Sequence, residues 1–437
     1  MTTVFIILIF IGMCVLMYTK KLSALFALPV MAFLIALVSG IPFMDTMVEE
    51  TSQAGILTLM FVEGPTRLAS AMMMLIFGAI LAQYVKTTGI AEASVRKVSE
   101  LAGDRPLVLG MSFMIVLSLL FTTLGGLGSV IMVGSIALPI MASVGIKPLT
   151  SGSILLISLS TGGIFNLANW GLYTDAMGLS VEQIRKFAYP LGAVFLVFGL
   201  LFVVVDVKFG GKLFGVNKRA KQKIAWPAPE PMAVSQKKVN LLAMLTPIVP
   251  LIMVLGLKVD IITGFVVGIL YCMATTINKD SLKQLTKSII EGISNSAGAI
   301  FLIIGIGMLL KVVMDPRVTE NIGPQLAQIL PTTGLTFVLF FAILAPLALY
   351  RGPLNVWGLG LGIGAIMMAT GRMSGLAIMA ALMSVGQIQG ICDPTNTHNV
   401  WTAASIGCDV NDILRKTLPF VWIASVIGLV IAAVMFY

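Results

Sequence analysis

A polar run that contains proline, Cys392-Asp-Pro-Thr-Asn-Thr-His-Asn399, interrupts a long apolar block. Pro394 has no backbone N–H and disfavours helical backbone at Asp393, so we expect a helix to stop there. Backbone groups freed inside a membrane are tolerated only where protein or a water-filled cavity satisfies them. The stretch therefore predicts a helix that breaks within the bilayer and surrounds the break with polar side chains.

The first half of the chain contains a corresponding break. Its sequence is Ser158-Leu-Ser-Thr-Gly-Gly-Ile-Phe-Asn-Leu-Ala-Asn169, which matches Ser384 to Asn399. Downstream, Gly178 to Pro190 matches Gly407 to Pro419 at a constant offset. We therefore expect broken helices at 151–178 and 374–407.

A different kind of interruption precedes each break. Thr122-Thr-Leu-Gly-Gly-Leu-Gly-Ser-Val130 separates two apolar blocks, and Leu349-Tyr-Arg-Gly-Pro-Leu-Asn-Val356 does the same in the second half. We interpret both regions as re-entrant helical hairpins with tips near the middle of the bilayer, at 106–145 and 334–370. Such hairpins and discontinuous helices, in inverted repeats around a central site, are typical of secondary transporters.

Composition places the whole chain in a membrane. Of its 437 residues, 58% are apolar and only 11% are charged, whereas a soluble domain has ~45–50% apolar and ~25% charged residues. Many apolar blocks approach the ~20 residues that a bilayer-spanning helix needs. These proportions exclude a soluble enzyme, a disordered chain and a nucleic-acid-binding domain, and they leave membrane lipid as the surrounding partner.

The predicted fold class is an all-α polytopic membrane protein with two inverted-topology repeats, each with five transmembrane spans and a re-entrant hairpin. The repeats occupy 1–206 and 239–437, and a basic linker joins them at 207–238. If the linker is cytoplasmic, most of the 28 Lys and Arg residues lie on the inner side of the membrane. This arrangement agrees with the excess of Lys and Arg that cytoplasmic loops carry. Each repeat crosses the membrane five times, an odd number, so the second repeat starts on the opposite side from the first and has the opposite orientation. Both termini then lie on the periplasmic or extracellular face of a bacterial inner membrane.

The glycine-rich first tip is a candidate substrate-binding site for an anion. Gly125, Gly126 and Gly128 allow the backbone to approach a ligand closely. The helix that starts near Ser129 would aim its N–H groups at the same place, and such a helix end attracts anions. The alternative interpretation is a glycine-rich contact between helices.

The second tip contains an arginine between two apolar blocks. An arginine in the membrane interior is costly and marks a functional candidate, and the planar guanidinium of Arg351 suits a carboxylate. We expect Gly352 and Asn355 to bind substrate beside it. The alternative is that Arg351 reaches the lipid headgroups or pairs with a structural acid.

Both breaks carry short amide and hydroxyl side chains. We expect three of them to bind substrate, namely Asn166, Thr395 and Asn396. Four more would couple transport to a cation, namely Asn169, Asp393, Thr397 and His398. Their oxygens and the freed carbonyls suit a dehydrated Na⁺, which we place at Asn166, Asn169 and Asn396. Asp393 would either bind Na⁺ or carry H⁺, and no other cofactor is expected. The alternative is a polar contact that orders the helices.

The run Gly125-Gly-Leu-Gly-Ser-Val-Ile-Met-Val-Gly-Ser-Ile-Ala-Leu-Pro-Ile140, followed by the break at Asn166, resembles the ion transporter superfamily. The gluconate permease, citrate symporter and anaerobic C4-dicarboxylate carrier families are the most similar members. Thr395-Asn-Thr397 is similar to the Ser-Asn-Thr signature of divalent-anion sodium symporters, although the second tip reads Arg-Gly-Pro instead. The resemblance implies a homodimer with scaffold and transport domains, and elevator-like alternating access through sites at the hairpin tips and breaks.

The resulting hypothesis is a symporter that moves a small organic carboxylate and is coupled to Na⁺ or H⁺. A cation/proton or oxyanion antiporter of the same superfamily is the first alternative. An anion channel is a further alternative, but dense packing of small residues suits an occluding carrier better. No motif for an intramembrane enzyme is apparent in the sequence.

Overall fold

The computed structural model describes residues 2–19, 21–48, 51–209 and 239–437. Within these ranges, the side chains of Val48, Thr51 and Arg351 lie outside the description. The predicted basic linker also lies outside the described residues, except at its first three positions, 207–209.

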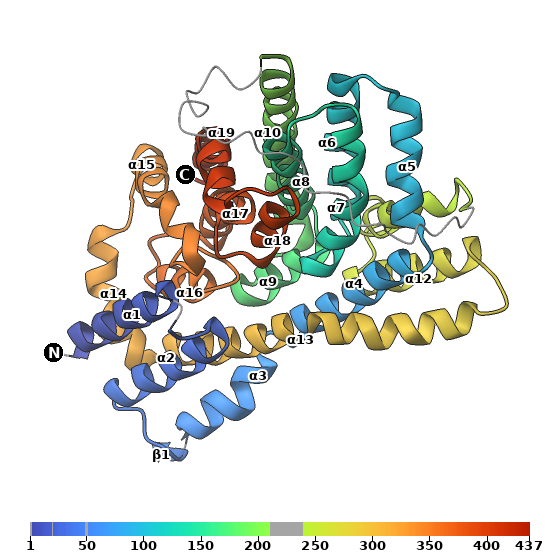
Figure 1. Ribbon diagram of the computed structural model, residues 1–437. Coiled ribbons are helices and arrows are strands. Elements are labelled where there is room, and N and C mark those ends of the chain that lie inside the picture. Colours follow the sequence, from blue (N-terminus) through green and yellow to red (C-terminus); the bar gives the residue numbers. More distant parts are fainter. Residues whose placement is uncertain (1, 20, 49–50, 210–238) are drawn as a thin grey trace.

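Helices form almost all of the described first half (Figure 1). Its elements are α1 (Thr2–Tyr18), α2 (Ala24–Val38), β1 (Thr46–Val48), β2 (Thr51–Gln53), the π-helix η1 (Thr58–Glu63), α3 (Gly64–Thr66), α4 (Ala69–Thr87), α5 (Ile90–Ala102), α6 (Pro106–Phe121), α7 (Gly126–Ser143), α8 (Pro148–Gly163), α9 (Leu167–Met177), α10 (Val181–Val203) and the π-helix η2 (Val204–Lys208).

All regular secondary structure in the described part of the second half is helical. Its elements are the 3₁₀-helix η5 (Ala243–Ile248), α11 (Val249–Leu251), the π-helix η6 (Ile252–Gly256), α12 (Ile261–Thr275), α13 (Ser281–Val313), α14 (Pro316–Ile329), α15 (Gly334–Leu344), the 3₁₀ segment η7 (Ala345–Arg351), α16 (Gly360–Ala369), α17 (Gly375–Cys392), α18 (Thr397–Ser405) and α19 (Val410–Phe436).

Length and apolar composition qualify several of these helices as membrane spans. Within the described ranges there are six such helices, or up to eight if each bent pair counts as one span. One bent pair is α8 with α9, at 47°, and the other is α14 with the segment Gly334–Tyr350, at 103°. The prediction of an all-α polytopic membrane protein is therefore confirmed. The inverted repeats and the domain boundaries stay predictions.

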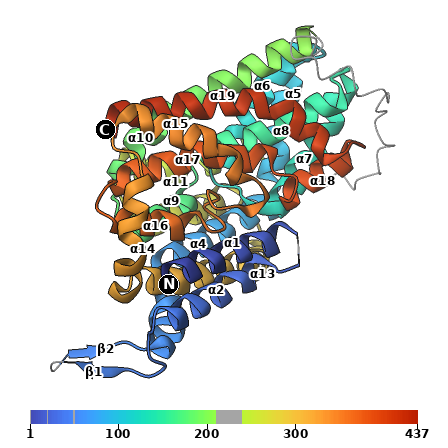
Figure 2. The same ribbon diagram turned by 90° about the vertical axis from the view of Figure 1, so that its left-hand side faces the viewer.

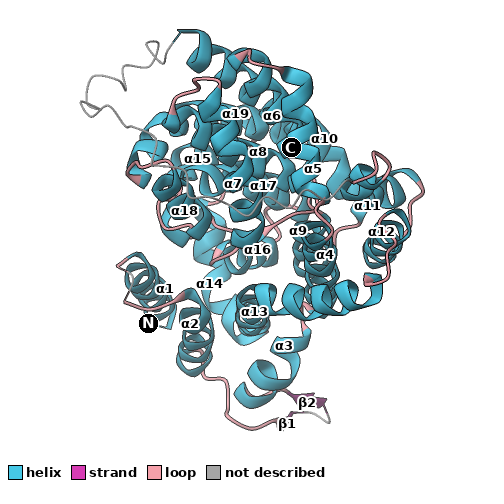
Figure 3. Cartoon of the chain, turned by 45° about the vertical axis from the view of Figure 1, so that its right-hand side comes forward, coloured by secondary structure: helices cyan, strands magenta, loops and turns pink. Residues whose placement is uncertain are grey.

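The helices pack in two groups, and each group draws on both halves of the sequence (Figures 1 and 3). In the first group, α13 packs on α2, α3 and α4, and α12 packs on α4. In the second group, α17 packs on α8 and α19, while α10 packs on α6 and α19. Contacts of α9 with α4 and of α16 with α13 join the groups.

Two close helix contacts depend on glycine. A Cβ built on Gly162 of α8 would overlap the carbonyl oxygen of Ser118 in α6, and one on Gly307 of α13 would overlap that of Gly64. Helices in a membrane gain their association energy from close packing, which small residues permit. The glycines therefore set the distance at which these helices meet.

A short β-hairpin is an element that the sequence analysis did not predict. Strands β1 and β2 pair in antiparallel fashion and project from the helices (Figure 2). At its base, the Asp45 carboxylate accepts a hydrogen bond from the Gly55 N–H at 2.8 Å, and Arg317 donates to the Ala54 carbonyl at 2.9 Å. The second contact links residues far apart in the sequence, so a local pattern could not reveal it.

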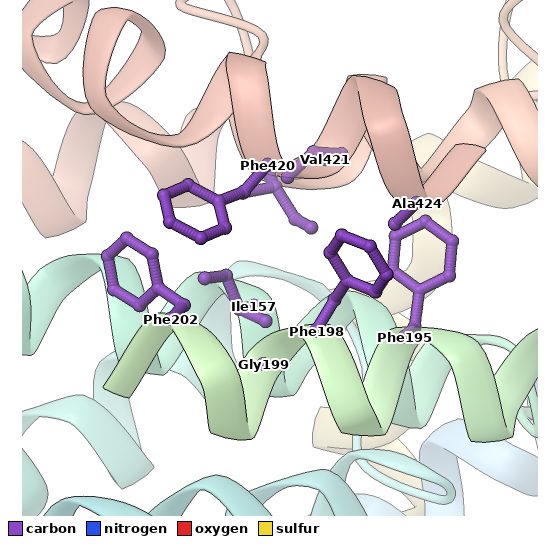
Figure 4. Close-up of a pocket in the computed structure, with 9 residues that line it drawn as sticks. Ile157, Phe195, Phe198, Gly199, Phe202, Phe420, Val421 and Ala424 are labelled. Carbon is purple, nitrogen blue, oxygen red and sulfur yellow. The ribbon is translucent and has the colours of Figure 1, made fainter. Parts of the chain in front are cut away.

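Aromatic rings fill the interface between α10 and α19 (Figure 4). The rings of Phe202 and Phe420 meet edge to face, with centroids 5.3 Å apart. The cavity beside them has a volume of about 10 Å³ and is lined entirely by apolar residues. That volume is about the space of one water molecule, so this cavity cannot hold an organic solute.

A buried ion pair fastens three helix ends in the second group. The Lys416 ammonium of α19 lies 2.6 Å from the Asp206 carboxylate of η2, and their side chains are 13% and 7% exposed. The Thr150 hydroxyl of α8 donates to the same carboxylate. Removal of one partner would leave an uncompensated charge in a site with little water.

We predict that Lys416→Met lowers the free energy of unfolding by about 3–5 kcal/mol, because Asp206 then stays buried without its partner. The double variant Lys416→Met/Asp206→Leu should recover much of that loss. Thermal unfolding in detergent measures both effects, and Lys97→Met, in an exposed pair with Glu100, is the control. Equal stability of the single and double variants would contradict the prediction.

Candidate functional site

The tip of the first predicted hairpin exposes the start of a helix. Helix α6 ends at Phe121 and α7 begins at Gly126, whose φ of 76° is one that glycine adopts readily. Gly125 occupies the N-cap position, and no described side chain caps α7. Residues Gly125–Leu127 are exposed, whereas Ser129 is buried. The first N–H groups of α7 are thus available to a ligand.

The first break is closed by its own asparagines. Asn166 is the N-cap of α9 and accepts a hydrogen bond from the Ala168 N–H at 3.1 Å. One turn later, the Asn169 side-chain amide donates to the Gly163 carbonyl, the last residue of α8, at 3.2 Å. Both sides of the break therefore find hydrogen-bond partners within the chain.

The first tip and the first break lie next to each other. A Cβ built on Gly125 would lie 3.8 Å from the side-chain nitrogen of Asn166, whereas no described atom lies within 4 Å of one built on Gly126 or Gly128. The fold thus brings together two predicted site residues, Gly125 and Asn166. It also leaves free space around the other two tip glycines.

The second break contains a fully buried acid. Asp393 follows the last residue of α17 and is 0% exposed. Its carboxylate accepts hydrogen bonds from the Thr395 N–H at 2.8 Å and the Thr395 hydroxyl at 2.7 Å. Pro394 lies between them, as the sequence predicted for a helix stop. The carboxylate is therefore held in place by the turn that interrupts the helix.

Three side chains from the next turn hold the carbonyls at the end of α17. The Asn396 amide donates to the Gln389 carbonyl at 3.0 Å, and the Asn399 amide donates to the Asp393 carbonyl at 2.8 Å. The third contact joins His398 Nε2 to the Gly390 carbonyl, at 3.2 Å. Predicted residues Asn396 and His398 thus belong to one compact cluster with Asp393 and Thr395.

Asn399 is a site residue that the sequence analysis missed. Asn166 and Asn396 both stand at the N-cap of a short helix, and Asn169 and Asn399 both donate to the carbonyl six residues earlier. The signal was present as Asn-x-x-Asn in both halves, at 166–169 and 396–399. The Asn399 Oδ1 atom is buried and has no hydrogen-bond partner among the described residues.

The two breaks differ in how the following helix starts. Asn166 uses its side-chain oxygen to cap α9, but no described side chain caps α18, because the Asn396 amide turns back to α17. Thr397, the first residue of α18, is exposed. The second break therefore presents uncapped N–H groups close to a buried carboxylate.

The broken helices of the two halves cross each other. The Ser160 hydroxyl of α8 donates to the Gln387 side chain of α17 at 2.6 Å, and a Cβ built on Gly390 would lie 2.7 Å from the Ser160 oxygen. Beside this crossing, the buried Thr161 hydroxyl has no hydrogen-bond partner among the described residues. The crossing places both breaks within one region of the second helix group.

Helix α18 also lies on the first hairpin. A Cβ built on Gly134 of α7 would lie 2.7 Å from the Trp401 ring of α18, so that glycine makes room for the indole. Helix α18 contacts α8 as well. Helix α18 of the second half therefore forms one side of the candidate site in the first half.

The backbone of the second tip makes a tight turn that ends at Gly352. A Cβ on Gly352 would overlap the Leu347 carbonyl oxygen, and Tyr350 has a left-handed φ of 56°. Asn355 is 1% exposed, and its amide nitrogen has no hydrogen-bond partner among the described residues. Segment η7 packs on α17. The side chain of Arg351 lies outside the description, so its role as a substrate anchor stays a prediction.

Asp175 serves a contact between the helix groups. Its carboxylate accepts a hydrogen bond from the Ala71 N–H of α4 at 2.7 Å, and Arg67 donates to its backbone carbonyl at 2.8 Å. The end of α9 is thereby fastened to the start of α4. The sequence analysis did not predict this contact, because nothing local relates the two segments.

We predict that Asn399→Ala lowers the free energy of unfolding by about 1–3 kcal/mol, because the buried Asp393 carbonyl loses its donor. Asn169→Ala should cost less, since Asn169 is only partly buried and water can replace its amide. Thermal unfolding of both variants in detergent makes the comparison. A larger loss for Asn169→Ala would contradict it.

No family model matches the chain. An uncharacterized transporter of Bacillus subtilis (strain 168), YraO, is 22% identical over 383 residues, which cover 82% of this chain and 81% of that protein. The crystal structure of the Alcanivorax borkumensis YdaH transporter, described as having an unusual topology, matches with a TM-score of 0.58 at 14% identity and covers 98% of this chain and 97% of that one.

A second solved structure has the same fold. It is Neisseria gonorrhoeae MtrF, described as illuminating a class of antimetabolite efflux pumps, with a TM-score of 0.57, 13% identity and coverage of 93% of this chain and 94% of that one. The chain thus shares its fold with two solved membrane transporters and is similar in sequence to a third protein named as a transporter.

Proposed function

We propose that the protein is a secondary active transporter for a small organic carboxylate, coupled to Na⁺ or H⁺. The observation that carries the proposal is the second break, where the fully buried Asp393 stands beside the uncapped start of α18. An acid inside a membrane protein is costly and marks an ion or substrate path. Discontinuous helices whose ends face a central site are the usual construction of such transporters.

The anion would bind at exposed helix starts. The starts of α7 and α18 both lack a described side-chain cap, and Gly125–Leu127 and Thr397 are exposed. Partial positive charge at these ends favours a carboxylate. The tip glycines leave room for it. Arg351, Gly352 and Asn355 of the second tip would complete the substrate site, with the guanidinium as the counter-charge.

The coupling ion would bind on the buried side of the breaks. Buried oxygens without described partners, Asn399 Oδ1 and Thr161 Oγ1, are hard ligands of the kind that Na⁺ needs. Asn166, Asn169 and Asn396 border the same breaks, and Asp393 would bind Na⁺ or carry H⁺. In this proposal two copies form a homodimer in a bacterial inner membrane, with both termini outside, and each transport domain moves as an elevator.

An antiporter that exports its substrate is the second candidate, and MtrF favours it, because that protein is described among antimetabolite efflux pumps. The same buried acid would then exchange an incoming cation for an outgoing solute. The two candidates share the site and differ in the direction of coupled flow. The sign of the gradient that drives uptake therefore separates them.

We predict that a transported carboxylate raises the unfolding temperature of the purified protein, and that Na⁺ enhances the shift if Na⁺ is the coupling ion. A ligand at a hundredfold excess over its Kd stabilises the native state by about 2.7 kcal/mol. A thermal-shift screen of mono-, di- and tricarboxylates with Na⁺ or K⁺ measures this. If uncharged analogues stabilise the protein equally well, the anion site is contradicted.

We predict that Arg351→Gln abolishes carboxylate uptake into proteoliposomes, because the substrate loses its counter-charge, while the thermal unfolding profile without ligand stays unchanged. Uptake is measured with an inward Na⁺ gradient, an inward H⁺ gradient, and each gradient reversed. Arg372→Gln, at an exposed position between α16 and α17, is the matched control. Normal uptake by Arg351→Gln would remove the anchor, and uptake driven only by an outward gradient would favour the antiporter.

A further inference from the structure

We propose that Tyr350 is the gating residue of the site, and that its contact with Tyr18 of α1 holds the second tip closed beside the break at Asp393. The inference rests on the proposed function to the extent that a carrier must open its site to one side at a time. It adds a residue pair and a closed state that the function alone does not supply.

The backbone of Tyr350 is strained. Its φ of 56° and ψ of 34° are left-handed, a conformation that a bulky side chain rarely adopts. Among the described residues, Lys258 is the only other non-glycine residue with a positive φ. Strain of this kind persists only where surrounding contacts enforce it, and it concentrates at functional sites and switch segments. Some contact must therefore hold Tyr350 in place.

The ring of Tyr18 supplies such a contact. The two ring centroids lie 4.9 Å apart with an interplanar angle of 65°, an edge-to-face arrangement. Tyr18 is the last residue of α1 and is 58% exposed. Helix α1 packs on α2 and on η7. The ring contact therefore joins the tip of the second helix group to a helix of the first group.

The strained segment lies against the helix that precedes the break. Segment η7 packs on α17, which ends at Cys392, directly before Asp393. The turn around Tyr350 is tightly wound, because a Cβ on Gly352 would overlap the Leu347 carbonyl oxygen. In the proposed gate, rotation at Tyr350 is the movement that opens this turn and the break beside it. Release of the Tyr18 ring would permit that rotation and relieve the strain.

The chain contains its own reporter of this opening. Cys392 is 1% exposed and directly precedes Asp393, and its thiol contacts the Thr417 hydroxyl of α19, so a reagent reaches it only when the break opens. Cys272 is 0% exposed and lies on α12, in the other helix group. It serves as an internal control for general unfolding. Labelling of each thiol by a small maleimide is quantified by peptide mass spectrometry on the full-length protein in proteoliposomes.

We predict that Tyr18→Leu and Tyr350→Ala each accelerate labelling of Cys392 about 2- to 10-fold, the factor that one aromatic pair contributes to a two-state equilibrium. Labelling of Cys272 should not change. Tyr350→Phe keeps the ring and should label like the wild type. As a matched control, Phe33→Leu removes another edge-to-face pair, with Phe43, and should leave Cys392 protected.

The gate is overturned if neither Tyr18→Leu nor Tyr350→Ala accelerates labelling of Cys392, or if Tyr350→Phe labels as fast as Tyr350→Ala. Parallel acceleration at Cys272 would also overturn it, because the variants would then act through unfolding. Tyr18 is largely exposed, so its variant tests the gate even if Tyr350→Ala does not fold. The assay uses no substrate, so failure of carboxylate transport leaves its result intact.

Discussion

The structure depends on one constraint, which is that a helix broken inside a membrane must find partners for its freed backbone groups within the protein. Both breaks meet it in the same way. An asparagine in the first turn of the following helix returns its amide to a carbonyl at or beside the end of the helix before, as Asn169 does for Gly163 and Asn399 for Asp393. The positions of these asparagines are therefore explained by the hydrogen-bonding needs of the interrupted backbone, without reference to a substrate.

The same constraint explains why the breaks are rich in polar side chains and still buried. Each amide that satisfies a carbonyl leaves an oxygen behind, and at Asn399 that oxygen has no partner among the described residues. A buried polar atom in that state costs free energy unless a ligand or water reaches it. The N-cap asparagines also differ, because Asn166 caps α9 with its side-chain oxygen, whereas no described side chain caps α18 at Asn396. This asymmetry distinguishes two breaks that look alike in sequence.

Both breaks lie in the second helix group, which is joined to the first through specific contacts. The groups meet at α9 with α4 and at α16 with α13, through contacts such as Asp175 with the Ala71 N–H. Within the second group, the crossing at Ser160 and Gln387 and the ion pair of Lys416 and Asp206 bind helices from both halves firmly to each other. These contacts tie the two halves of the sequence together both within the second group and between the groups.

The membrane class, the helical content and the positions of the interruptions could be predicted from the sequence, because hydrophobicity and the backbone restrictions of proline and glycine act locally. The helix stop at Asp393 follows from Pro394, its immediate neighbour, whereas the helix that the sequence predicts to start near Ser129 begins at Gly126. The contacts between distant groups could be seen only in the folded chain. It set Gly125 beside Asn166, Trp401 on Gly134 and Tyr18 against Tyr350, since these contacts depend on how separate helices pack and no local pattern encodes that packing.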